Sequence, residues 1–271
     1  MSRLKIAVVL AGQPRFIDQA FSSIKNNLLQ DYDVDAFIHF WKGKTLFDER
    51  HPNAKDMNVT ENDSLYEKSL ELYNPKAWLF EPQPDTRFNF YYCETFGDPQ
   101  QFSTMQNIMS AGNTFPLADL TTWSDNREKL FPTYGNYPHH NTSQWISWQR
   151  ANNLKMAYEC QNGFKYDWVV RLRSDYVLKT LIKFESYDKS ALHVKDDCHH
   201  HMSRGDWYSL NDHFGFGSSE TMDYYANFID YLPKYYQIDR IKFNTEVLLG
   251  WHINQAKIEV QKHAIGCTVI R

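Results

Sequence analysis

Residues 1–82 alternate between short apolar runs and longer stretches whose apolar positions recur at helical spacing. The apolar runs are rich in β-branched and aromatic residues, which favour buried strands. They are 4–12, 33–41 and 76–82. Between them, 15–29 and 64–73 repeat apolar residues every three or four positions, as an amphipathic helix does. Strands and helices in this alternation predict a parallel sheet with helices on its faces.

Residues 83–140 break the alternation, since they are rich in Pro, Asn, Gly, Thr and aromatic residues. One short helical pattern occurs among them, at 101–112. Irregular segments of this length inside a compact domain are usually functional loops or lids, although a plain covering loop fits the composition equally well. We therefore interpret 83–140 as an irregular insertion.

The regular pattern returns in 141–271. Helices are predicted at 142–163, 219–231 and 243–253. Strands are predicted at 166–178 and 191–195, followed by a strand leading into a glycine loop at 207–219 and two extended pieces in 257–271. Thr142 or Ser143 is expected to cap the first helix, and Gly163 to end it. We expect one α/β domain over 1–271, with a mainly parallel, Rossmann-like central sheet and helices on both faces.

The composition excludes several classes of protein. The net charge of -4 and the pI near 6.2 argue against a nucleic-acid-binding protein, which needs a basic surface to meet phosphates. The 4 cysteines are scattered, which fits a reducing compartment better than a disulfide-bonded framework. No apolar run is long enough to cross a membrane, and the amino-terminal one is too short for a signal peptide. We expect a soluble, cytoplasmic protein.

Candidate chemistry is concentrated where predicted strands end, which is where open α/β sheets bind ligands. Gly12, Gln13 and Arg15 follow the first strand and open a helix. Amide groups at a helix start hold anions, and an arginine beside them neutralises phosphate. A tight turn with a surface arginine is the plainer alternative.

Three charged residues end the strand predicted in "DWVVRLRSDYVL". Arg171, Arg173 and Asp175 fall on the same side of an alternating strand. Such a concentration of charge is unfavourable unless something lies between the groups. A diphosphate, with or without a divalent cation, would balance the arginines. A buried salt bridge between Arg173 and Asp175 would explain the pattern without a ligand.

A carboxylate late in the chain, Glu246, begins the apolar helix predicted at 243–253. It either complements the helix dipole or acts as a general base that takes a proton from an incoming hydroxyl. Asp212, which lies beside the predicted glycine loop, is the rival for the second role.

The combination of motifs resembles the nucleotide-sugar glycosyltransferases of the GT-A fold. Those enzymes carry, in order, a nucleotide loop, an Asp-x-Asp motif, a glycine loop, an acidic motif and often a terminal histidine. The matching segments here are "AGQPR", "RLRSD", "DHFGFGS", "NTE" and "KHAIG". The pairing of "GQPR" with "RLRSD" is also similar to the WavE lipopolysaccharide-synthesis group and to glycosyltransferases encoded by large algal viruses (chloroviruses). The resemblance covers most of the chain outside 83–140.

This resemblance implies a role for each matching residue. The nucleotide and donor side would comprise Gly12, Gln13, Arg15, Gln144, Arg171, Arg173 and Asp175. The acceptor side would comprise Gly215 and Gly217. Apart from the resemblance, Trp207 is a candidate for stacking on a sugar at this side, although an aromatic residue that begins a strand is more often part of the core. Residues 1–82 would form the nucleotide-binding half and 141–271 the catalytic half. The insertion 83–140 is a candidate for acceptor contact, although a lid or a dimer contact would look the same.

The resemblance also implies a mechanism. Glu246, or its rival Asp212, would deprotonate an acceptor hydroxyl, which attacks the anomeric carbon opposite the leaving nucleotide and inverts its configuration. Asp175 and His263 would hold Mn²⁺ or Mg²⁺. One position departs from the family pattern, because Arg173 replaces the first aspartate of Asp-x-Asp. A guanidinium pairs with phosphate oxygens and can partly replace a cation, so the need for a metal stays open.

The expected donor is a UDP-sugar, such as UDP-xylose or a UDP-hexose, and the expected acceptor is an oligosaccharide or other glycan. A viral member would act in the host cytoplasm. Two other functions stay open. The loss of the first aspartate favours a non-catalytic nucleotide- or sugar-binding protein of the same fold. A metal-dependent hydrolase would use "CHHH", Cys198–His201, to hold zinc, although adjacent side chains do not easily surround one ion.

Overall fold

The structure, a computed structural model, describes residues 3–43, 63–83, 138–196, 209–237 and 245–270. Within these residues a 7-stranded sheet has the order β3-β2-β1-β4-β7-β6-β8. The strands are β1 (Lys5–Gly12), β2 (Asp33–Lys42), β3 (Ala77–Pro82), β4 (Trp168–Leu172), β6 (Leu192–Lys195), β7 (Gly215–Gly217) and β8 (Val260–His263). Neighbouring strands are parallel except at β7, which runs antiparallel to both β4 and β6.

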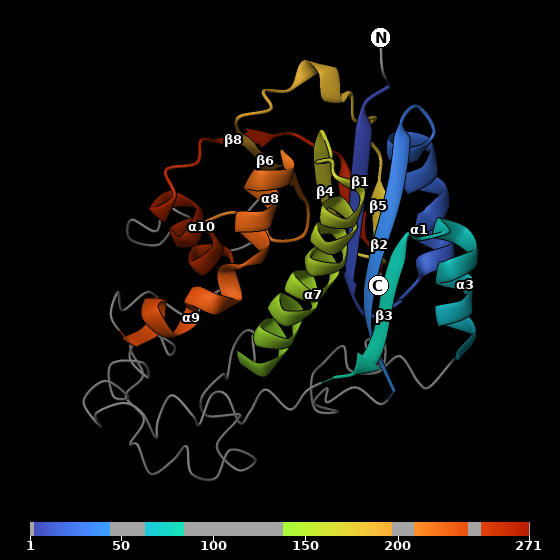
Figure 1. The fold of residues 1–271 in the computed structure, drawn as a ribbon, viewed down its shortest axis with the longest axis horizontal. Coiled ribbons are helices and arrows are strands. Elements are labelled where there is room, and N and C mark those ends of the chain that lie inside the picture. Colours follow the sequence, from blue (N-terminus) through green and yellow to red (C-terminus); the bar gives the residue numbers. More distant parts are fainter. Residues whose placement is uncertain (1–2, 44–62, 84–137, 197–208, 238–244, 271) are drawn as a thin grey trace.

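Helices cover both faces of this sheet (Figure 1). The face that we call the α7 face carries α7 (Pro138–Asn162), α8 (Ser219–Ala226), α9 (Phe228–Gln237) and α10 (Thr245–Gln255). The opposite face, the α1 face, carries α1 (Ile17–Ile24), the π-helical turn η1 (Lys25–Leu29), α3 (Asp63–Tyr73), the 3-10 turn η3 (Phe184–Ser186) and the paired strands β5 (Tyr176–Leu178) and β9 (Cys267–Val269). The predicted α/β class, with a mainly parallel, Rossmann-like sheet, is confirmed.

The central strand β1 is buried on both sides. Ile6, Val8 and Leu10 pack on the α1 face, whereas Ala7 and Val9 pack on the α7 face. None of these side chains is more than 3% exposed. A parallel strand covered on both faces has a continuous apolar run instead of alternating polar and apolar positions. This burial explains why the first apolar run in the sequence predicts a strand.

The start of α7 differs from the prediction. The helix begins at Pro138, so Thr142 and Ser143 lie inside its first turns instead of capping it. Its end agrees with the prediction, because Gly163 directly follows the helix with a φ of 68°. Only glycine adopts this left-handed conformation without strain, which is why it stops a helix.

The predicted glycine loop also takes a different form. Gly215 and Gly217 lie within strand β7, not in a loop after a strand. The residues before β7 form a turn in which the Asn211 side chain accepts hydrogen bonds from the amides of His213 and Phe214. Asparagine competes with regular structure in this way, and so the strand begins only after the turn.

Strands from 1–82 and 141–271 join directly, because β1 pairs with β4. The single-domain organisation of the chain stays a prediction. Of the predicted insertion 83–140, residues 84–137 with the helical pattern at 101–112 lie outside the described residues, as does the segment 197–208, whereas 138–140 belong to α7. Among the helices of the described part, none is both long and apolar enough to span a bilayer.

Candidate functional site

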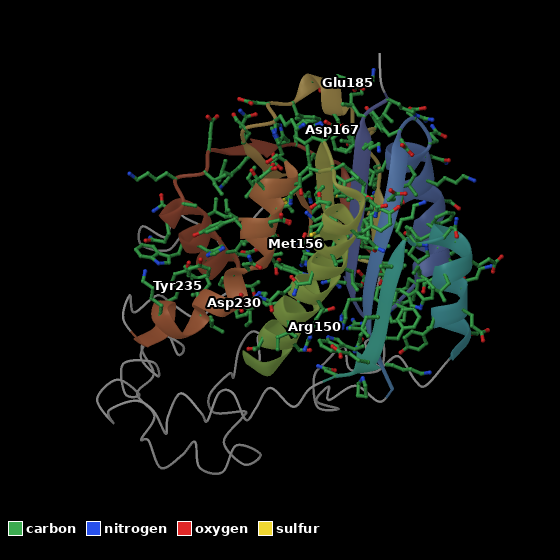
Figure 2. The ribbon with its side chains drawn as sticks, viewed as in Figure 1. Arg150, Met156, Asp167, Glu185, Asp230 and Tyr235 are labelled. Carbon is green, nitrogen blue, oxygen red and sulfur yellow. The ribbon has the colours of Figure 1, made fainter. Side chains whose placement is uncertain are left out.

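The order of strands around β1 creates a switch point at the carboxyl edge of the sheet. From β1 the chain passes to β2 and β3 on one side, and β4 then pairs with β1 on the other side. The loops after β1 and β4 therefore leave in opposite directions, and open α/β sheets bind ligands between such loops. The amino edge lies at the other end of the sheet, where Asp167 and Glu185 are labelled in Figure 2.

Contacts with distant segments hold the loop after β1 at this switch point. Gly12 has a φ of 110°, which favours glycine, and its amide donates a hydrogen bond to Ser147 Oγ of α7 at 2.7 Å. The hydroxyl of Ser174, just beyond β4, donates to the carbonyl oxygen of Gln13. The β1 loop is thus attached both to α7 and to the end of β4.

Arg173 and Asp175 form an ion pair just beyond β4. Nε and Nη2 of Arg173 donate to Oδ1 and Oδ2 of Asp175 at 2.8 and 2.7 Å. Burial alone would raise the pKa of Asp175, but the charges of Arg173 and Arg15 hold it below its ordinary value. The salt bridge that offered a ligand-free explanation of "RLRSD" is therefore present, and any ligand must bind beside it or open it.

Arg15 approaches the same ion pair from the β1 loop. Its Nε donates to Oε1 of Gln13 at 2.7 Å. Burial, and then the charge of Arg173, lower the pKa of Arg15 to about 10, while Asp175 acts in the opposite sense. Arg15 and Arg173 thus lie close enough to repel each other, and a bound anion would relieve that repulsion.

Arg171 lies on the α7 face of β4 and is only 2% exposed. Its guanidinium stacks on the indole of Trp148, with Cζ 3.4 Å from the ring centre. Among the described residues, none hydrogen-bonds to its Nε, Nη1 or Nη2. Burial lowers the pKa of Arg171 to about 10. Buried donors without acceptors are uncommon in folded proteins, so this arginine has unused capacity to bind an anion.

Asp212 lies close to these arginines. It is 7% exposed, accepts a hydrogen bond from Gln144 Nε2 at 3.2 Å, and lies 3.5 Å from His213 Nε2. Its charge acts to raise the pKa of both Arg171 and Arg173. The α7 helix, the end of β4 and the turn before β7 therefore converge here. All the residues predicted for the donor side lie around this point, and their roles stay predictions.

Glu246 is the second residue of α10 and is 4% exposed. Its carbonyl oxygen accepts a hydrogen bond from the amide of Leu210 at 3.1 Å. This contact attaches the start of α10 to the turn that carries Asp212. The two candidate bases therefore come from adjoining segments, and the position of Glu246 at a helix start agrees with the prediction.

The glycines predicted for the acceptor side pack closely against the α7 face. Gly215 is opposite Arg171 in the β4–β7 pairing, and a Cβ there would lie 3.9 Å from the ring of Tyr225. A Cβ at Gly217 would lie 3.0 Å from Thr221 Cγ2 and 3.3 Å from the carbonyl oxygen of Ala191, so these neighbours would have to shift slightly. Gly217 therefore lets Thr221 of α8 pack closely on the sheet. The third residue of this group, Trp207, lies outside the described residues.

The two predicted metal ligands have different neighbours in the structure. His263 Nε2 lies 2.8 Å from Nδ1 of His193, whose ring stacks on Phe216 on the α1 face. Asp175 lies with Arg15 and Arg173, which occupies both of its carboxylate oxygens. No group of three or more His, Cys, Asp or Glu side chains suited to a metal occurs among the described residues. These residues do not fit a divalent cation at Asp175.

Three residues at the site were not singled out as site residues by the sequence. Ser174 joins the β1 and β4 loops, His213 flanks Asp212, and Trp148 stacks on Arg171. Ser174 and His213 are each adjacent in sequence to a predicted site residue, and this adjacency could have identified them as candidates. Trp148 was recognised only as part of a helix face, and its stacking partner comes from a distant strand.

Comparisons with known proteins give limited information. Residues 151–271, fewer than half of the chain, match a family model described as a domain of unknown function, DUF7796. No curated protein matches the chain. Among solved structures, the chain is similar to core-mannan synthase A from Aspergillus fumigatus in its Mn/GDP form. The identity is 8%, the TM-score is 0.43, and the match covers 100% of this chain and 75% of that one.

A likeness with this TM-score does not establish a shared activity. Neither of these two matches is to the WavE group or to a viral enzyme. That finer resemblance stays a prediction.

Proposed function

We propose that the protein is a glycosyltransferase that binds a nucleotide-diphosphate sugar at the switch point between β1 and β4. The observation that carries the proposal is the convergence there of Arg15, Arg171 and Arg173, with Arg171 buried and lacking a hydrogen-bond acceptor among the described residues. A nucleotide diphosphate offers anionic oxygens to Arg171, which lacks an acceptor among the described residues, and to Arg15 and Arg173, whose charges repel each other. Its place at the carboxyl edge of the sheet follows the general rule for open α/β folds.

The balance of charge favours a diphosphate over a neutral ligand. Among the described residues, the charges of two carboxylates, Asp175 and Asp212, act on these three guanidinium groups, so the positive groups outnumber the negative ones. Guanidinium groups pair with phosphate oxygens through parallel, charge-assisted hydrogen bonds. Such donors also stabilise the negative charge that develops on a diphosphate as it leaves a sugar.

The proposed reaction is the one that the resemblance to GT-A glycosyltransferases implies. A carboxylate, Glu246 or its rival Asp212, takes the proton of an acceptor hydroxyl. The hydroxyl oxygen forms a bond to the anomeric carbon, while the bond from that carbon to the diphosphate oxygen breaks and its electron pair leaves with the nucleotide. Attack from the face opposite the diphosphate inverts the anomeric configuration. A UDP-sugar carrying xylose or a hexose is the proposed donor, and a glycan hydroxyl the proposed acceptor.

One observation favours a second function, that of a non-catalytic nucleotide- or sugar-binding protein. Arg173 holds both carboxylate oxygens of Asp175, the residue that the resemblance assigns to the donor site. A protein that keeps the binding charges and lacks turnover would show this arrangement. The two functions differ in whether the sugar is released from the nucleotide.

The test is a panel of UDP- and GDP-sugars, with binding measured by thermal shift and turnover by release of UDP or GDP in the presence of oligosaccharide acceptors. A true donor raises the melting temperature, because it binds only the folded state. Glu246→Gln should lower turnover by about 10²- to 10⁴-fold with nucleotide affinity unchanged. Asp212→Asn should instead alter nucleotide affinity, because Asp212 neighbours the arginines.

The outcomes separate the alternatives. Loss of turnover in Asp212→Asn with full activity in Glu246→Gln would exchange the two roles. Binding of a nucleotide sugar without any release would establish the binding protein. Failure of every nucleotide to bind would overturn the glycosyltransferase proposal.

A further inference from the structure

The residue that departs from the Asp-x-Asp pattern, Arg173, lies at the centre of the charged site. Its guanidinium holds both oxygens of Asp175, and its side chain is 25% exposed. A divalent cation bound by Asp175 would have to lie beside this positive charge. Hard cations such as Mg²⁺ also require several oxygen ligands, usually carboxylates and waters. Asp175 is therefore poorly suited to hold a metal while Arg173 is in place.

No other described group compensates for this loss. His263, the second predicted ligand, lies on the α1 face beside His193. Asp212 is engaged by Gln144 and His213. Within the described ranges, no set of three His, Cys, Asp or Glu side chains has a metal-binding arrangement. Asp175 and Asp212 thus already have cationic, imidazole or amide partners.

The arginines, in contrast, have the features of an anion site. Arg171 is buried against Trp148, and its three nitrogen atoms lack hydrogen-bond acceptors in the described part of the chain. Arg15 lies close enough to Arg173 for their charges to repel each other. A diphosphate placed among them would supply acceptors and reduce the repulsion in one step. The charge that a metal ion brings to a diphosphate is already present in the side chains.

We infer that this site binds a diphosphate without a divalent cation, with Arg15, Arg171 and Arg173 supplying the positive charge that a metal would otherwise provide. The inference rests on the proposed function, because it concerns the same site and the same diphosphate. It extends that function by proposing that arginine side chains, instead of a metal ion, neutralise the diphosphate.

The test uses the full chain, with inorganic pyrophosphate, UDP and GDP as probes. Titration calorimetry measures the dissociation constant of each probe, once in EDTA and once in Mn²⁺. We expect the probe that binds best to bind in EDTA, with Mn²⁺ tightening this binding by less than about threefold, which is less than about 1 kcal/mol of binding free energy. Binding that is at least tenfold tighter in Mn²⁺ overturns the inference and leaves the proposed function standing. Absence of binding in both buffers overturns both.

A variant gives the reciprocal test. Arg173→Asp creates an acidic pair with Asp175 and makes the charge of the site more negative by two units. We expect its binding in EDTA to weaken by at least tenfold, in line with the loss of a charged hydrogen bond, and to be partly recovered by Mn²⁺. Binding in EDTA that is unchanged in Arg173→Asp overturns the role given to this arginine. The circular dichroism spectrum of each variant establishes that it is folded.

Two further variants keep the test decisive if Arg173→Asp does not fold. Arg173→Lys retains the charge without the planar, two-pronged geometry, and we expect weaker binding that stays independent of Mn²⁺. Arg150→Ala is the matched control, since Arg150 lies on α7 with an exposed side chain and pairs with Glu81 (Figure 2). Arg150→Ala should bind pyrophosphate like the unaltered chain. An equal loss in Arg150→Ala and Arg173→Lys would overturn the inference.

Discussion

At the scale of single residues, burial determines which ionisable groups can carry charge. Arg171 stays buried although its guanidinium lacks hydrogen-bond acceptors within the described residues. Its stacking on Trp148 offsets part of that cost, since a desolvated cation over an indole contributes about 2 kcal/mol. His252 differs from Arg171, because burial favours the uncharged form of its ring. Both residues are held by aromatic side chains of the α7 face.

The surroundings of His252 predict a dependence of stability on pH. Its Nε2 lies 2.7 Å from the carbonyl oxygen of Tyr224 and its Nδ1 lies 2.6 Å from the hydroxyl of Tyr235, an arrangement that suits the neutral ring. Burial lowers the pKa of His252 from 6.5 to about 4. Between these pH values the unfolded chain binds the proton more readily than the folded one, so stability falls as the pH falls.

We expect the unfolding free energy to drop by up to about 3 kcal/mol between pH 7 and pH 4 through this one group. Urea denaturation at several pH values measures the drop. His252→Gln removes the titrating group, so its stability should depend less steeply on pH over this range. Equal slopes for the two proteins would show that His252 is not responsible.

At the scale of elements, α7 is anchored to the rest of the molecule by buried polar contacts. Near its middle, Ser147 Oγ accepts from the amide of Gly12 and lies 2.8 Å from His39 Nδ1 of β2. Further along, Lys155 donates to Glu159 of the same helix and to Asp223 of α8, at 3.0 and 2.6 Å. These contacts fix the helix relative to β1 and α8, and so they position the wall of the candidate site.

The contacts of Lys155 predict a large loss of stability on substitution. Its side chain is 0% exposed, and Lys155→Met would leave Glu159 and Asp223 with one buried partner fewer. Removing one member of a buried ion pair typically costs about 3–5 kcal/mol, and we expect a loss near the lower end because Lys165 also pairs with both carboxylates.

Lys165→Met is the matched control for this prediction. Its side chain is 50% exposed and contacts the same two carboxylates, so its removal should cost less than about 1 kcal/mol. Urea denaturation of both variants measures the difference. Equal losses would show that burial of Lys155 is not what makes its contacts important.

At the scale of the whole molecule, the sheet has a well-covered centre and more open edges. β1 and β4 lie in the middle of the strand order, and their residues from Ile6 to Leu10 and from Trp168 to Leu172 are all buried. At one edge of the sheet, Trp78 of β3 is 51% exposed. At the other edge, no residue of β8 is fully buried. Stability against local opening should therefore decrease from the centre outwards.

Hydrogen exchange of the backbone amides tests this gradient. We expect the amides of β1 and β4 to exchange most slowly, at rates set by unfolding of the whole sheet, and those of β3 and β8 to exchange faster through local opening. Exchange of β3 or β8 that is as slow as that of β1 would contradict the expectation.

The sequence alone was sufficient for most of the local structure. The apolar runs of β1 and β2 and the helical spacing of α7 depend on periodicity that a buried element imposes on neighbouring residues. The sequence also indicated the ion pair of Arg173 with Asp175 as one alternative, because only one residue separates the two. The predicted start of α7 and the predicted glycine loop at Gly215 were wrong in detail. Helix capping and turn formation there depend on contacts with residues that are distant in the sequence.

Only the tertiary structure decided which distant residues meet. Arg171 is buried on Trp148 because α7 packs over β1, the neighbour of β4, and His263 meets His193 because β6 pairs with β8. Local periodicity records whether a side chain is buried, but not which segment covers it. The sequence therefore determined the α/β elements and the charged strand ends of this protein, whereas the packing of α7 over β1 and β2 and the pairing of β1 with β4 decided how those charges form one site.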